Sequence, residues 1–205
     1  MRSNDFDGIA KWYDRLAKFI FGDAIIKSQL HFLNELPEEG NLLIIGGGSG
    51  WILEEVVIFR PRLKIDYLEA SAKMIELSKA RNVSSTDVQF IIGTEVDIPE
   101  TIYDGIVTNF FLDVFDESRL KVIMDHLKGK LSEDGVWLCT DFHKTGRWKH
   151  KLLLKTMHLF FGLVSNLDAN TLIDFENEFK RLSLSCLKKQ IFYNGMIFSA
   201  VYRLT

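Results

Sequence analysis

The sequence contains few cysteines and no long uncharged apolar run. Its two cysteines, Cys139 and Cys186, lack a CxxC motif and any spacing with histidine that would suggest a metal site. Each lies in an apolar, strand-like run. We therefore expect two buried free thiols in a reducing cytoplasm, and no bound metal.

Membrane and export signals are also lacking. No stretch approaches the roughly 18 uncharged apolar residues of a membrane-spanning helix. The first residues, MRSNDFDGIAKWYDR, carry charges where a signal peptide needs an apolar core. We expect a cytoplasmic protein without stable membrane insertion.

Positive charge is not in excess. The formal net charge is −3, which provides no overall field to attract nucleic acid. A small molecule or another protein is therefore the expected partner, and monomer and homodimer both stay open.

The apolar content suffices for one globular domain. The chain has 205 residues, of which 47% are hydrophobic, and no repeat, low-complexity tract or linker marks a second domain. We treat 1–205 as a single domain with three parts: a helical segment at 1–40, a core of strands and helices at 41–142, and helices with a hairpin at 143–205.

Strands and helices are expected to alternate along this domain. Residues 42–45 form an unbroken apolar run, typical of a parallel strand buried on both faces. Strands are expected next at 63–68, 88–92, 105–109 and 136–141, and helices at 51–59, 72–81, 117–131, 147–163 and 168–181. The pattern predicts an α/β fold with a doubly wound sheet, mostly parallel, and helices on both faces.

The last part of the chain departs from this alternation. Two strand-like runs, 182–193 and 196–204, are joined by Asn194-Gly195, a strong hairpin signal. The predicted fold is therefore a seven-stranded Rossmann-like sheet that ends in an antiparallel hairpin.

Glycine is concentrated directly after the first predicted strand, in Gly46-Gly47-Gly48-Ser49-Gly50. Glycine is needed where a turn has positive φ and where a cofactor touches the backbone. Ligands collect at such strand ends in open α/β sheets. A tight turn without a ligand is the alternative, but it requires fewer glycines.

The glycine spacing distinguishes two cofactor classes. A dinucleotide-binding GxGxxG motif would place its third glycine at Trp51. The spacing is instead GxGxG, which suits a nucleoside cofactor without a pyrophosphate, such as S-adenosylmethionine. A nicotinamide-dependent oxidoreductase stays as a less favoured alternative.

Glu69 ends the second predicted strand, about 20 residues after the glycines, where an acid can bind both ribose hydroxyls. A carboxylate accepts two hydrogen bonds from a diol. An acid that is merely solvated is the alternative.

Six segments carry a resemblance to a known family over about residues 6–142. They read FDGIAKWYDRLAKFIFG, LLIIGGGSG, IDYLEASAKMIELSKAR, VQFIIGTEVDIP, YDGIVTNFFLD and LSEDGVWLCTDF. The chain resembles the class I S-adenosylmethionine-dependent methyltransferases, in particular the ubiquinone/menaquinone-biosynthesis branch.

This resemblance implies S-adenosylmethionine as cofactor and S-adenosylhomocysteine as product. It implies that the glycine loop wraps the methionine, that Glu69 binds the ribose and that residues after the third strand frame the adenine. The implied cofactor contacts are Gly46, Gly47, Gly48, Ser49, Gly50, Glu69, Ala70, Met74, Thr94, Glu95, Asn109 and Phe110.

Two positions depart from the family pattern. Ile44 and Thr94 stand where many members carry acids for the methionine ammonium and the adenine amino group. Glu95 or Asp97, and a backbone carbonyl, are the expected substitutes. These departures motivate a second hypothesis, a noncatalytic binding module with this fold.

The acceptor site has no fixed motif, because methyl transfer gains mainly from alignment and exclusion of water. A hydroxyl or acidic carbon acceptor would use a base near the carboxyl ends of the strands. Asp113, Asp141 and His143 are the candidates. Each has a structural hydrogen-bonding role as its alternative.

Aromatic residues are expected to bind the acceptor. In the resembling family the N-terminal segment covers the pocket, which implies roles for Trp12 and Tyr13, together with Phe111 after the fourth strand. Simple packing of a helix on the sheet is the alternative.

The basic amphipathic segment at 144–161 would cover an apolar substrate, lie on a membrane surface, or be an ordinary domain helix. A small, apolar or aromatic acceptor is therefore expected.

Overall fold

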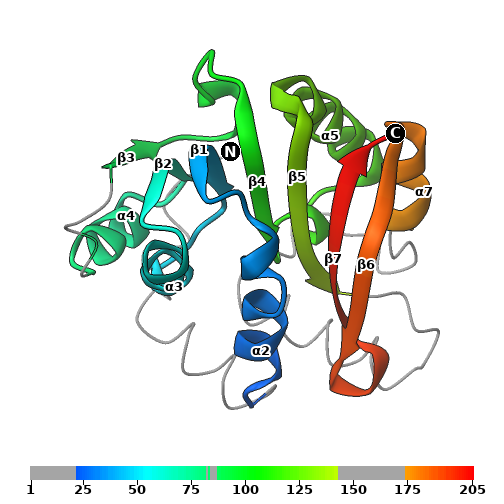
Figure 1. The fold of residues 1–205 in the computed structure, drawn as a ribbon, viewed down its shortest axis with the longest axis horizontal. Helices are drawn as coiled ribbons and strands as arrows, with labels where there is room; N and C mark the ends of the chain where they lie inside the picture. The colour runs from blue at the N-terminus through cyan, green and yellow to red at the C-terminus, as the bar shows by residue number, and fades with distance from the viewer. Residues whose placement is uncertain (1–21, 82, 84–86, 143–173) are drawn as a thin grey trace.

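A computed structural model describes residues 22–81, 83, 87–142 and 174–205. It contains a seven-stranded sheet of order β3-β2-β1-β4-β5-β7-β6 (Figure 1). The strands are β1 (Glu39–Ile45), β2 (Arg62–Glu69), β3 (Asp87–Ile92), β4 (Tyr103–Asn109), β5 (Leu131–Phe142), β6 (Leu184–Phe192) and β7 (Ile197–Leu204). Strands β1 to β5 are parallel, and β7 is antiparallel to both β5 and β6. The predicted mostly parallel sheet with a C-terminal antiparallel hairpin is confirmed.

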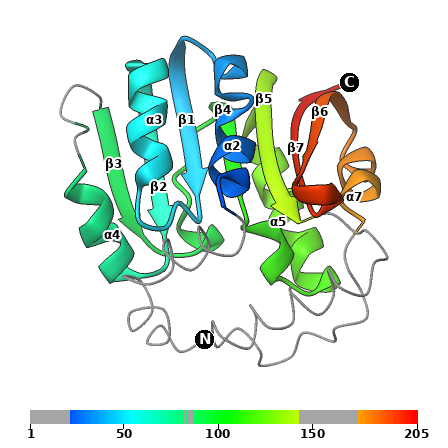
Figure 2. The ribbon, with the colours of Figure 1, turned by 90° about the horizontal axis from the view of Figure 1, so that it is seen from below.

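Helices cover both faces of this sheet (Figure 2). They are α2 (Ala24–Leu30), α3 (Trp51–Phe59), α4 (Ala72–Lys79), α5 (Glu117–Lys130) and α7 (Phe175–Arg181). Leu42 and Ile44 of β1 belong to a core with α3, whereas Leu43 and Ile45 belong to a core with α5 and α7. The unbroken apolar run of β1 is therefore buried on both faces, as predicted, and the doubly wound arrangement is confirmed.

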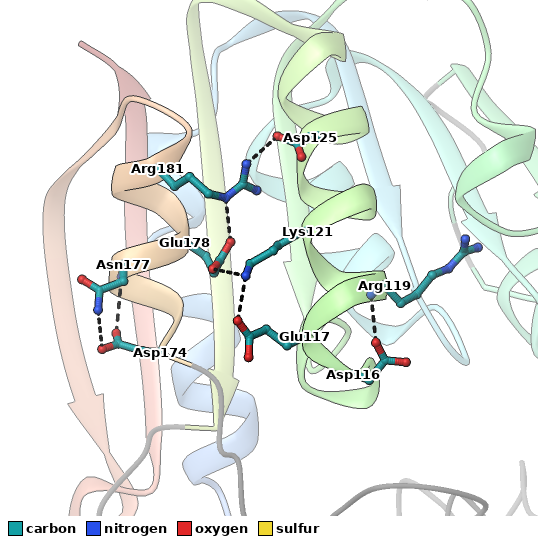
Figure 3. Close-up of polar contacts among 9 residues, drawn as sticks. All are labelled: Asp116, Glu117, Arg119, Lys121, Asp125, Asp174, Asn177, Glu178 and Arg181. Atoms are coloured by element: carbon teal, nitrogen blue, oxygen red, sulfur yellow. Dashed lines mark hydrogen bonds and ion pairs between the residues drawn. The ribbon is translucent and has the colours of Figure 1, made fainter.

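An ion-pair network joins α5 to α7 on the outside of the second core (Figure 3). Lys121 of α5 pairs with Glu117 at 2.7 Å and with Glu178 of α7 at 4.0 Å. Arg181 of α7 pairs with Glu178 at 2.9 Å and with Asp125 of α5 at 2.8 Å. Because these pairs are partly exposed, each is expected to contribute little to the stability of the fold.

Several element boundaries differ from the predictions. Strand β5 begins at Leu131, five residues before the strand predicted at 136–141, and a register irregularity separates its pairs Tyr103↔Leu131 and Gly105↔Val136. Strand β6 begins at Leu184 because Ser183 has a φ of 58°, which ends α7 in a left-handed turn. The Asn194-Gly195 hairpin is confirmed, with a φ of 54° at Asn194.

One of the two thiols is not buried. Cys139 of β5 is buried as expected, but Cys186 is exposed. The expectation for Cys186 was wrong because β6 is the edge strand of the sheet, and most of its side chains face solvent. Apolar content alone does not distinguish an edge strand from a central one.

Some predicted elements lie outside the described residues, namely residues 1–21 of the helical segment expected at 1–40 and the helix expected at 147–163. Within the described ranges no helix is both long and apolar enough to cross a membrane.

Candidate functional site

The glycine loop connects β1 to α3 at the carboxyl edge of the sheet. Gly46, Gly48 and Gly50 have φ values of 67°, 63° and 82°, which favour glycine at all three positions. A Cβ on Gly46 would lie 2.5 Å from the Phe111 ring, and one on Gly50 would lie 2.5 Å from Ser78 of α4. A Cβ on Gly48 would meet nothing within 4 Å. The loop is thus closely packed at both ends and open at its centre.

Two side chains of β2 hold this open centre. Glu69 accepts a hydrogen bond from the backbone N–H of Gly48 at 3.0 Å, through Oε2, and from that of Ser71 at 2.9 Å, through Oε1. The Tyr67 hydroxyl donates to the Gly48 carbonyl at 3.0 Å, and its ring lies directly beneath Gly47. Both side chains reach the loop because residues two apart on a strand share a face.

Arg81, just after α4, holds the other end of the loop. Its Nε donates to the Ser49 carbonyl at 3.0 Å, and its Nη1 pairs with Glu54 of α3 at 2.8 Å. Sequence reasoning missed Tyr67 and Arg81. Because strand residues two apart share a face, the position of Glu69 could have indicated Tyr67. No local feature of the sequence indicated the contact of Arg81.

The segment after β3 is fastened to the same place. The Gly93 N–H donates to the Glu69 carbonyl at 3.0 Å. Asp97 accepts the Thr94 N–H at 2.8 Å, and Glu95 is turned inward and forms an ion pair with Arg119 of α5. The two acids proposed as substitutes for an adenine contact are therefore already engaged within the protein.

Two further predicted contacts follow β2. Ala70 is exposed at the strand end. Met74 is buried in α4, and its backbone N–H donates to the Ser71 hydroxyl that caps this helix. Ile44 is buried in β1 and offers no polar group to the loop.

The end of β4 presents an amide and aromatic rings. Asn109 Nδ2 is buried and has no hydrogen-bond partner among the described residues. Phe110 has a φ of 51°, which is rare for an aromatic residue and is found at strained functional positions. Its ring lies 5.0 Å from that of Phe142, and the Phe111 ring lies 5.1 Å from that of Phe115.

Two of the three candidate bases come together beside these rings. Asp141 is the second-last residue of β5 and is 0% exposed. Its Oδ2 accepts the Leu112 N–H at 3.1 Å and its Oδ1 accepts the Phe142 N–H at 2.8 Å. Burial and the nearby Asp113 charge raise the pKa of Asp141 well above its usual value. The other predicted residues of this group, His143, Trp12 and Tyr13, lie outside the described residues.

The site fits a nucleoside sulfonium in three respects. The centre of the glycine loop is open at Gly48. Each oxygen of Glu69 accepts one backbone N–H and keeps capacity for a second donor, as binding of a diol requires. The amide of Asn109, which has no hydrogen-bond partner in the described part of the chain, provides a donor for a carboxylate or carbonyl.

Comparison with known proteins agrees with this arrangement. Residues 16–179 match the family described as "Methyltransferase domain". A malonyl-[acyl-carrier protein] O-methyltransferase of Ilyobacter polytropus is 29% identical over 62% of this chain and 48% of that protein. A polyamine aminopropyltransferase of Prochlorococcus marinus is 28% identical over 63% of this chain and 50% of that protein. The chain thus spans about half the length of the curated relatives it matches.

A solved structure shares the fold. The N-methyltransferase NodS of Bradyrhizobium japonicum, in complex with S-adenosyl-L-homocysteine, has a TM-score of 0.64 at 14% identity, over 87% of this chain and 85% of that one. Because the family match covers most of the sequence, the chain belongs to the methyltransferase-domain family.

Proposed function

We propose that the protein transfers a methyl group from S-adenosylmethionine to a small, apolar or aromatic acceptor. The observation that carries the proposal is the carboxylate of Glu69, held beside the open centre of the glycine loop by two backbone donors. When bound, the cofactor supplies a methyl group activated by its sulfonium.

Glu69 binds the ribose diol in this proposal. Its position is set before any ligand arrives, because the N–H groups of Gly48 and Ser71 already orient both carboxylate oxygens. A carboxylate that is already oriented loses little side-chain freedom when a ligand binds, which favours affinity. The Tyr67 hydroxyl and Arg81 keep the loop in the same conformation.

Asn109 and the phenylalanines complete the proposed site. The Asn109 amide donates to a carboxylate or carbonyl of a ligand, which removes an otherwise unsatisfied buried donor. Phe110, Phe111 and Phe142 offer apolar surface to the acceptor and exclude water from it. Exclusion of water and alignment are the main requirements of a methyl displacement.

The known proteins support the class of reaction. The names of the relatives and of the neighbour describe O-methyl, N-methyl and aminopropyl transfer, and the neighbour is in complex with S-adenosylhomocysteine. The same cofactor class and a transfer to an acceptor are proposed for this chain. The mass added to an acceptor distinguishes a methyl from an aminopropyl group.

Calorimetric titration with S-adenosylhomocysteine tests the proposal. We expect micromolar binding by the wild type, weakened by about 1–3 kcal/mol in Glu69→Ala, the scale for loss of a hydrogen-bonded charged partner. Glu76→Gln, on an exposed position of α4, is the matched control and should bind like the wild type. Absence of binding to a folded wild type would favour the noncatalytic binding module instead.

A further inference from the structure

The last peptide group of the glycine loop, between Ser49 and Gly50, is bound by a side chain from another part of the chain. Arg81 follows α4, and its Nε donates to the Ser49 carbonyl at 3.0 Å. Its Nη1 pairs with Glu54, in the first turn of α3, at 2.8 Å. One guanidinium group therefore spans the junction at which the loop becomes α3, with one contact before Gly50 in the sequence and one after it.

Gly50 leaves this peptide group free to turn over. A peptide turns over when ψ of one residue and φ of the next change together, and glycine has no Cβ that restricts φ to one sign. Packing nevertheless requires glycine here, because a Cβ on Gly50 would lie 2.5 Å from the Ser78 side chain and 2.7 Å from its Cα. A larger residue at position 50 therefore cannot restrict the peptide, so a contact made by the peptide itself has to select its orientation.

The contact with Arg81 selects one of the two orientations. The peptide bond is trans, so its C=O and N–H groups point in opposite directions. Because the Ser49 carbonyl is directed at Arg81, the Gly50 N–H points away from Arg81. If the peptide turned over, the carbonyl would lose the arginine and take the place of the N–H. Arg81 thus determines whether the loop offers a donor or an acceptor on its other side.

Glu54 orients the arginine for this contact. The side chains of Arg81 and Glu54 are 29% and 34% exposed, so their ion pair is expected to contribute little to the stability of the fold. Its geometry matters more, because a guanidinium group is planar and its donors point in fixed directions. The bond to Glu54 through Nη1 therefore sets the direction in which Nε donates to the Ser49 carbonyl.

We propose that Arg81 is a positioning residue for the cofactor and keeps the Ser49–Gly50 peptide in the orientation that a bound cofactor requires. This inference rests on the proposed binding of S-adenosylmethionine. The Gly50 N–H donates to an acceptor group of the cofactor, whereas a turned-over peptide would offer a carbonyl, which cannot bond to such a group. Arg81 acts through the peptide and does not itself touch the cofactor.

A first test needs no ligand. In NMR spectra of the isotope-labelled protein, the wild type should show one backbone amide resonance for Gly50. In Arg81→Ala this resonance should broaden by exchange or split, because the peptide then populates both orientations. Arg60→Ala is the matched control: Arg60 Nε also donates to a backbone carbonyl, that of Leu36 at 2.8 Å, but at the opposite end of α3. An unchanged, single Gly50 resonance in Arg81→Ala would refute the selection of one orientation.

A second test measures the affinity for S-adenosylhomocysteine by calorimetry. Arg81→Ala should weaken binding by on the order of 10-fold, near the upper end of the scale for one hydrogen bond. Arg81→Lys should recover part of this loss, because an ammonium can donate to one carbonyl but lacks the planar fork. Glu54→Gln should weaken binding less than Arg81→Ala, because the bond to Ser49 remains. Arg60→Ala should bind like the wild type, and urea unfolding shows that each variant is folded.

The outcomes separate this inference from the proposal on which it rests. If the folded wild type does not bind S-adenosylhomocysteine, the proposed function fails, and this inference fails with it. If the wild type binds while Arg81→Ala binds equally well, or Arg60→Ala loses as much affinity, the role of Arg81 is refuted and the cofactor proposal stands. If Arg81→Ala does not fold, Arg81→Lys takes its place, with a smaller loss of affinity expected and the same two refuting results.

Discussion

The carboxylate of Glu69 lies 3.0 Å from the backbone nitrogen of Gly48 and accepts its hydrogen. Tyr67 donates to the carbonyl of the same glycine from two residues earlier on β2. Gly48 is therefore held at both of its peptide groups by one neighbouring strand, although it has open space on its outer side. The protein's own contacts with β2 therefore orient the loop.

Tyr67→Phe tests this preorganisation, because it removes the hydroxyl and keeps the ring under Gly47. We expect S-adenosylhomocysteine affinity to fall by roughly 1 kcal/mol, the scale of one hydrogen bond, as measured by calorimetry. Tyr103→Phe is the control, because its hydroxyl donates to Asp66 rather than to the loop. Equal affinities of the two variants would show that the Tyr67 hydroxyl does not orient Gly48 for binding.

Phe110 offers a test of backbone strain. In the middle of an ordinary strand, a protein with glycine is less stable than one with alanine at the same position by about 0.5–1 kcal/mol. Because Phe110 has a φ of 51°, Phe110→Gly should be more stable than Phe110→Ala by about 1 kcal/mol. Urea unfolding gives both free energies, and both variants lose the same contact with Phe142. A higher free energy of unfolding for Phe110→Ala than for Phe110→Gly would contradict the left-handed conformation of Phe110.

Asp141 makes stability depend on pH. Its raised pKa in the folded protein means that the folded state keeps a proton that the unfolded chain releases above about pH 4. The free energy of unfolding should therefore fall as pH rises from about 4 toward the folded-state pKa, by at most about 1.4 kcal/mol per pH unit. Urea midpoints of Asp141→Asn should show a shallower dependence over this range. Parallel curves would mean that Asp141 keeps an ordinary pKa.

The packing of α7 separates apolar from ionic stabilisation, because Phe179 packs on Tyr202 of β7 and Arg181 forms ion pairs with Glu178 and with Asp125 of α5. Phe179 is fully buried, and its ring stacks on Tyr202 with the centroids 3.7 Å apart. Phe179→Ala should lower the free energy of unfolding by about 3–5 kcal/mol. Arg181→Ala should lower it by less than about 1 kcal/mol, because its ion pairs are partly exposed. Chemical denaturation measures the free energy of unfolding of both variants. A larger loss for Arg181→Ala than for Phe179→Ala would mean that the ion pairs stabilise α7 more than its apolar packing does.

Local sequence patterns predicted much of the fold. The unbroken run 42–45 indicated a strand buried on both faces, and Asn194-Gly195 indicated the final hairpin; the strand pairings confirm both. The place of β6 at the sheet edge had no local signal, because it depends on strand order, and this is why Cys186 was misjudged.

The site was predictable to a lesser degree. The glycine spacing and Glu69 could be identified because both lie at ends of predicted strands, and the structure joins them through Gly48. The contacts of Arg81 with Ser49 and of Asp141 with Leu112 depend on packing between distant segments. The roles of all these residues in binding and catalysis stay predictions.

The position of β7 between β5 and β6 sets an order of events during synthesis. Of the described strands, β7 leaves the ribosome last, yet it pairs with two strands that precede it. Until residues 197–204 emerge, the outer edge of β5 has no partner from the hairpin, and β6 has no strand to pair with. A nascent chain halted before β7 therefore exposes unpaired strand edges, the kind of surface that aggregates or recruits chaperones.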